Sequence, residues 1–187
     1  MSRFSDYLYS IGKVNNLAKQ GCVSDILWFF HCGMLFSSRY KWWKDFGKRT
    51  TSHEGIDIAW FAADNKIIRL FDETILVPAM DSGTIVNICD DFLGRTIVVE
   101  QYMKRPAAQR LVFAYAHVIP AKGLKTGSSL KKGEVIAKIS RTHRNARPGP
   151  HLHFSCIEIS RNIPCDLLDW NLFTTTGKAN LINPVFL

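Results

Sequence analysis

Two histidines one residue apart, His151 and His153, lie in an apolar run near the end of the chain. Side chains of an extended strand alternate between its faces with a period of two, so we expect both imidazoles on one side. Far upstream, His53 and Asp57 stand four positions apart. Together these groups could hold a zinc ion by three ligands and leave a coordination position for water, which is typical of catalytic zinc sites.

His53 and Asp57 can supply two ligands from a loop that leads into a strand, and Gly55 would let the backbone bend between them. His153 can supply the third ligand. His151 shares its strand face and must lie near the same ion, which favours a supporting or base role. A fifth group, His117, ends an apolar strand, where a polar residue can leave the core and face a cleft. A lone histidine there is usually a packed side chain, but the other four groups reverse that expectation.

Three motifs now stand together: His53-Glu-Gly-Ile-Asp57, Tyr115-Ala-His117 and Gly149-Pro-His-Leu-His-Phe154. The chain therefore resembles the lysostaphin-type zinc endopeptidases, which cleave peptidoglycan with a compact β-sheet domain. Further segments resemble that family in the same order along roughly residues 46–187. They are Phe46-Gly-Lys-Arg49, Asp81-Ser-Gly-Thr-Ile-Val86, Lys132-Gly-Glu-Val-Ile136 and Asn183-Pro184.

The resemblance implies a division of roles among the five side chains. His53, Asp57 and His153 are carried over as zinc ligands, and His117 and His151 as the catalytic pair. One of the pair, with His151 favoured, would orient or deprotonate a zinc-bound water. The other would bind the oxyanion and help to protonate the leaving amine. The sequence does not decide which histidine does which.

The first part of the chain has a helical pattern. Apolar residues recur at helical spacing over residues 7–17, with Ser5 as the predicted N-cap and Gly21 at the end of the helix. Ser24 is predicted to cap a second helix over residues 26–35.

From about residue 46 onward, short β-branched and aromatic runs are broken by Gly, Pro and Asp. These runs predict strands. The predicted strands are 55–61, 74–77, 83–89, 96–101, 110–117, 135–139 and 151–159. Residues 164–170 have a weak helical pattern, and residues 62–74 look like an insertion.

We therefore expect a mainly β fold, a compact antiparallel sheet or sandwich that the resemblance identifies with the duplicated hybrid motif type. Residues 1–45 are predicted to form a helical N-terminal extension and residues 46–187 the zinc endopeptidase domain.

The chain has 187 residues, 47% of them hydrophobic, and a formal net charge of +8. A basic surface favours an anionic partner or simply aids solubility, but no nucleic-acid motif is present. Five cysteines without metal-pair or disulfide spacing leave the redox compartment open. The sequence does not reveal the oligomeric state. We expect no secretory signal and no membrane span. The resemblance nevertheless implies the cell envelope, in periplasm or cell wall, with peptidoglycan peptides as partners.

Four functions compete on these observations. The leading hypothesis is a zinc endopeptidase that hydrolyses peptide cross-links of peptidoglycan through a zinc-activated water. The alternative is a non-catalytic zinc-binding relative that acts as a binding or regulatory module, but such relatives typically lack one of the five groups. A sugar-phosphotransfer module would need facing histidines but no carboxylate, so Asp57 argues against it. A structural zinc site would need four closed ligands.

Overall fold

The computed structural model describes residues 2–18, 25–64, 67–102, 106–141 and 148–187. In this part of the chain there are two α-helices and three short 3-10 helices: α1 Arg3–Val14, η2 Cys32–Met34, η3 Cys165–Leu167, α2 Trp170–Thr175 and η4 Pro184–Phe186. The strands are β1 Leu27–Phe29, β2 Ile56–Ile58, β3 Trp60–Ala62, β4 Ile68–Leu70, β5 Leu76–Pro78, β6 Gly83–Asp91, β7 Gly94–Gln101, β8 Gln109–Pro120, β9 Ser129–Leu130, β10 Val135–Ile139, β11 Leu152–Ser160 and β12 Ala179–Ile182. The mainly β fold class is confirmed. None of the described helices is long and apolar enough to cross a membrane.

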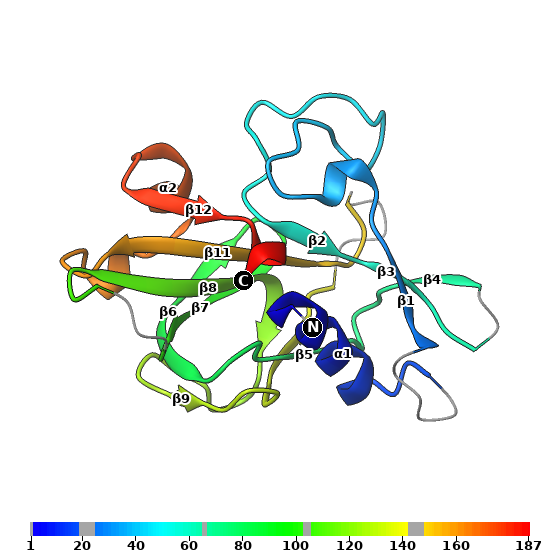
Figure 1. The fold of residues 1–187 in the computed structure, drawn as a ribbon, viewed down its shortest axis with the longest axis horizontal. Helices are drawn as coiled ribbons and strands as arrows, with labels where there is room; N and C mark the ends of the chain where they lie inside the picture. The colour runs from blue at the N-terminus through cyan, green and yellow to red at the C-terminus, as the bar shows by residue number, and fades with distance from the viewer. Residues whose placement is uncertain (1, 19–24, 65–66, 103–105, 142–147) are drawn as a thin grey trace.

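The main sheet among the described residues is antiparallel and has nine strands, with the central order β12-β11-β8-β7-β6-β9. At its margins β10 pairs with β5 and β8, and β2 pairs with β11. A separate sheet of three strands has the order β1-β3-β4 and projects to one side of the molecule (Figure 1). The predicted strand over residues 55–61 is thus two strands in two sheets, and the insertion over residues 62–74 supplies β4.

Both faces of β8 are covered, because its residues from Leu111 to Val118 are buried. Phe113 and Tyr115 point to the larger core, whereas Val112 and Ala114 point to a smaller core under α2. This alternation is the period-two pattern of a strand, but with apolar side chains on both faces. The sequence over this strand therefore reads as a continuous apolar run.

Helix α1 begins earlier than predicted. Its N-cap is Ser2, whose side chain accepts a hydrogen bond from the backbone of Ser5, so the assignment of Ser5 as the cap is wrong. The helix ends at Val14, and the side chain of Asn15 bonds to both backbone groups of Leu76 in β5. The helix therefore does not run to Gly21 as predicted; Gly21 itself and the predicted cap at Ser24 lie outside the described residues.

The second predicted helix, over residues 26–35, is wrong. These residues form β1 and η2, and Leu27 and Phe29 pair with Ala62 and Trp60 of β3. Aromatic side chains favour strands, and a short apolar run has no period that separates helix from strand. Residues 164–170 hold η3 and the first residue of α2, in partial agreement with their helical pattern.

Helix α1 packs on the same core as the main sheet. Tyr7 is 1% exposed, and its ring lies 6.2 Å from that of Tyr115 and 5.2 Å from that of Phe154. The two termini meet beside this helix, where the Arg3 amide donates to the Leu187 carbonyl (Figure 1). The domain boundary after residue 45 stays a prediction.

Tyr7 offers a stability test of this packing. We expect Tyr7→Ala to lower the free energy of unfolding by about 3–5 kcal/mol, the usual cost of removing a buried aromatic ring. Its hydroxyl is buried and has no hydrogen-bond partner among the described residues, so Tyr7→Phe should be close to neutral. Urea unfolding of the three proteins measures both effects. Equal stability of the alanine variant and the parent would show that α1 is a loosely attached appendage.

Candidate metal centre

The candidate site forms where β2 pairs with β11. Asp57 lies directly opposite His153 in this antiparallel pair, so two of the predicted ligands are cross-strand neighbours. Gly55 precedes β2, and a Cβ atom there would lie 2.3 Å from the Phe154 carbonyl oxygen and 2.4 Å from Ser155 Oγ. A glycine is therefore needed for close approach of the two backbones.

Three donor atoms converge at this point. His53 Nε2 lies 3.0 Å from Asp57 Oδ1 and 3.0 Å from His153 Nδ1, and Asp57 Oδ1 lies 2.9 Å from His153 Nδ1. Ligands at ~2.0 Å from a tetrahedral zinc ion are ~3.3 Å apart, close to these separations. The three side chains are buried and form the metal-ligating group found among the described residues. The donor set therefore fits zinc.

The second nitrogen of each imidazole in this donor set is also engaged. His53 Nδ1 donates to the Leu35 carbonyl at 3.0 Å, and His153 Nε2 lies 3.0 Å from Ser155 Oγ. These partners fix the rings so that His53 offers Nε2 and His153 offers Nδ1 to a metal.

Burial alone would raise the pKa of Asp57, but the charges and hydrogen bonds of the surrounding histidines hold it well below its usual range. Burial lowers the pKa of His153, which favours the neutral ring that a metal ligand needs.

His151 lies beside the donor set. Its Nδ1 donates to the Gly149 carbonyl at 2.8 Å, and its Nε2 lies 3.7 Å from Asp57 Oδ1. Burial lowers the pKa of His151 to about 3, so the ring is neutral and Nε2 carries a lone pair. This is the form that can accept a proton.

His117 faces the same space from β8, with its ring centre 4.8 Å from that of His151 and 5.8 Å from that of His153. It does not end its strand as predicted, because β8 continues to Pro120. Instead, the pairing of β7 with β8 shifts register at this point, which indicates a β-bulge. The φ angle of His117 is 64°, a conformation that non-glycine residues rarely adopt and that redirects its side chain.

Asp91 holds His117 in this conformation. It ends β6, and its carboxylate accepts hydrogen bonds from His117 Nδ1 at 3.0 Å and from the His117 backbone amide at 2.9 Å. Thr96 and the Leu93 amide also donate to it. Burial works to raise the pKa of Asp91, but the hydrogen bonds and charge of His117 outweigh it and lower that pKa. Sequence reasoning missed Asp91, although an acidic residue at the tip of a hairpin beside β8 was an available signal.

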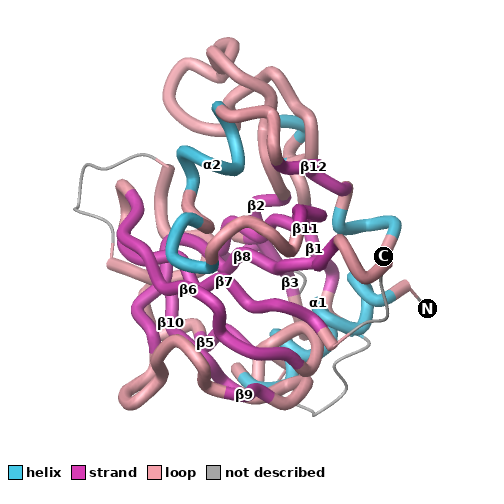
Figure 2. Tube along the Cα trace, turned by 90° about the vertical axis from the view of Figure 1, so that its left-hand side faces the viewer, coloured by secondary structure: helices cyan, strands magenta, loops and turns pink. Residues whose placement is uncertain are grey.

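A cleft of about 330 Å³ lies over these groups. The loop over residues 36–55 and α2 stand on one side of the main sheet, and α1 lies on the other (Figure 2). The walls of the cleft come from this loop, the β6–β7 hairpin, the segment before β11, and α2. Their lining residues include Trp43, Arg49, Glu54, Asp90, Phe92, Pro148, Trp170 and Thr174. Aromatic and acidic side chains thus surround the five histidine and aspartate groups.

The structure brings all five predicted site residues to this one cleft. The assignment of their roles stays a prediction. Glu54, next to His53 in sequence, also lines the cleft, whereas Trp60 and Tyr102 are not among its lining residues. His31 caps η2 through its ring.

One comparison with known proteins identifies a family. The sequence model of Peptidase family M23 matches residues 51–164, a segment that contains all five residues. No curated protein sequence matches the chain.

Three solved structures are similar to this chain. Lysostaphin, the antimicrobial peptidase of Staphylococcus simulans, is 19% identical over 79% of this chain and 51% of its own, with a TM-score of 0.42. The catalytic domain of the prophage-encoded M23 protein EnpA from Enterococcus faecalis is 18% identical over 83% and 92%, with a TM-score of 0.42. A zinc-containing peptidase from Vibrio cholerae is 22% identical over 70% and 33%, with a TM-score of 0.42. The chain thus spans about half the length of lysostaphin and a third of the Vibrio protein.

Proposed function

The chain belongs to peptidase family M23, and from that premise we propose that it is a zinc endopeptidase that hydrolyses peptide cross-links of bacterial peptidoglycan in the cell envelope. Zinc is the cofactor of this family, and the His-Asp-His donor set fits it. One observation carries the proposal: three side chains that could hold a metal and two further histidines meet at one cleft.

His53, Asp57 and His153 would hold the ion through the three converging atoms described above. Zinc bound there supplies Lewis acidity, which makes a water molecule acidic near neutral pH and polarises a peptide carbonyl. Three protein ligands leave a position open for that water.

His151 would act as the general base. Its Nδ1 proton is committed to the Gly149 carbonyl, so Nε2 is the atom that accepts the proton of the attacking water. Its place beside Asp57 Oδ1 puts this nitrogen next to the metal-facing side of the cleft.

His117 would serve the oxyanion and the leaving amine. The Nδ1–H group of His117 donates a hydrogen bond to Asp91, which leaves Nε2 as the nitrogen available to a substrate. When the ring is protonated, Nε2 donates a hydrogen bond to the developing oxyanion, and its proton can then pass to the amine. His117 of β8 and His151, which directly precedes β11, would thus divide the two proton transfers.

Digestion of purified sacculi of several wall chemistries, with and without a chelator, tests the proposal. We expect peptides with new amino ends, identified by mass, from at least one wall type. Their release should stop when zinc is chelated and resume when zinc is restored. If the protein binds zinc but releases no chelator-sensitive product from any wall, the non-catalytic binding module replaces the enzyme.

A further inference from the structure

The two oxygens of Asp57 have different surroundings. Oδ1 faces His53 Nε2 and His153 Nδ1, at 3.0 and 2.9 Å. Oδ2 points the other way and accepts a hydrogen bond of 2.6 Å from Trp42 Nε1, while Arg49 Nη2 lies 3.5 Å from it. The carboxylate is therefore divided between a metal-facing oxygen and an oxygen held by the protein.

Trp42 is fixed in place by its neighbours. It is 6% exposed, and its ring makes edge contacts with Trp43, Trp60 and His151, at centroid distances of 5.8, 5.7 and 5.3 Å. An indole packed on several sides cannot turn its N–H group away from Asp57 without disturbing this cluster. The indole of Trp42 thus links a predicted ligand to the predicted base.

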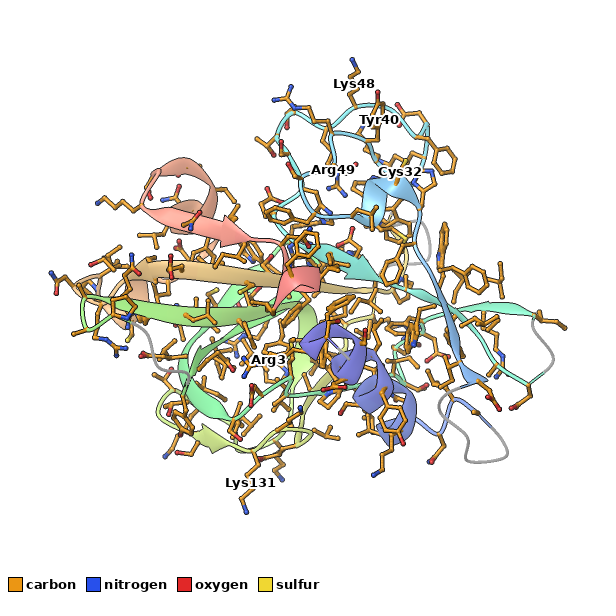
Figure 3. All side chains as sticks on the ribbon, in the orientation of Figure 1. Arg3, Cys32, Tyr40, Lys48, Arg49 and Lys131 are labelled. Carbon is orange, nitrogen blue, oxygen red and sulfur yellow. The ribbon has the colours of Figure 1, made fainter. Side chains whose placement is uncertain are left out.

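Arg49 is less suited to hold Oδ2 alone. Its guanidinium donates to the carbonyls of Gly33 and Tyr40 and stacks on the Trp43 ring, 4.6 Å from the centroid. In Figure 3, Arg49 turns inward beneath the loop, whereas its neighbour Lys48 projects away from the molecule. Because the arginine is committed to the loop, the short hydrogen bond to Oδ2 comes from Trp42.

We propose that Trp42 is a positioning residue that holds Oδ2 of Asp57, so that this carboxylate ligates zinc through Oδ1 alone; the inference rests on the proposed zinc site. A carboxylate released from Trp42 could bring its second oxygen to the ion and occupy the position meant for water. Hydrogen-bond partners of metal ligands orient them, and their loss typically weakens metal binding.

The test compares two tryptophans of the same cluster. Trp42→Phe removes the N–H group and keeps an aromatic ring, whereas Trp60→Phe is the matched control. Trp60 touches Trp42, but its buried Nε1 has no hydrogen-bond partner among the described residues. By competition with a chromophoric chelator, we expect the zinc Kd of Trp42→Phe to rise about 10–100-fold and that of Trp60→Phe to stay unchanged.

The visible absorption spectrum of the cobalt-substituted proteins gives a second measurement, which loss of packing alone would not change. A carboxylate that binds through both oxygens raises the coordination number, so the visible absorption of Trp42→Phe should weaken while that of Trp60→Phe should match the parent. Equal zinc affinity and equal cobalt spectra in Trp42→Phe and the parent would overturn the inference. If the parent protein itself binds no zinc, the result contradicts the proposed function and not the role of Trp42 alone.

If Trp42→Phe does not fold, the parent protein still decides the matter. Its ¹H–¹⁵N spectrum contains the indole N–H signal of Trp42. This signal can be assigned through its contacts with the neighbouring rings. We expect that proton to stay protected from solvent exchange when zinc is added, because the bond to Oδ2 persists. Loss of its protection on zinc binding would contradict the proposal.

Discussion

Asp57→Asn is expected to weaken zinc binding more than about 100-fold, beyond the usual cost of losing a hydrogen-bond partner of a ligand. Peptide hydrolysis should fall on the order of 10³-fold or more, because metal polarisation supplies several kcal/mol of transition-state stabilisation. Asparagine keeps the shape of the side chain but removes the negative charge that faces His53 and His153. Zinc stoichiometry by elemental analysis and product release from sacculi measure the two losses.

Glu54→Gln is the matched control for this prediction. It neutralises another carboxylate that lines the same cleft, next to His53 in sequence, but Glu54 is not in the donor group. Its zinc content should equal that of the parent. An Asp57→Asn protein with full zinc content and full hydrolysis would show that the carboxylate is not a ligand.

The strands that position the site could be predicted because their patterns are local. The residues of β10 agree with the predicted range, and β6, β7, β8 and β11 differ from their predicted ranges only at the ends. The period of two also turns His153 of β11 and His151, which directly precedes that strand, to the same side, where both approach Asp57 Oδ1.

The supporting groups could not be predicted, because their contacts join distant parts of the chain. Trp42 reaches Asp57 only when the loop over residues 36–55 folds over β2. Asp91 reaches His117 because a hairpin end meets a bulge on the next strand, and bulges have no clear signal in a single sequence. The predicted ligands are recognised by type and spacing, whereas the residues proposed to orient them depend on tertiary packing.

His117→Ala and His151→Ala are each expected to lower turnover by ~10²–10⁴-fold, the usual contribution of one acid–base group. Zinc content should not change, because neither ring belongs to the group of three converging donors. Reduced turnover with unchanged zinc content would distinguish these two histidines from the predicted ligands, whose loss is expected to remove metal and activity together. The rate at which soluble peptides are released from sacculi, together with the zinc content of the same protein samples, checks both halves of the prediction.

His31→Ala is the control for loss of an imidazole as such. His31 is not among the residues that line the cleft, and its ring caps η2, so that variant can lose stability but should keep its turnover. Full activity in either His117→Ala or His151→Ala would remove that histidine from the mechanism. If only His151→Ala loses activity, a single histidine must serve both proton transfers, and the hold of Asp91 on His117 is then a structural feature of the bulge.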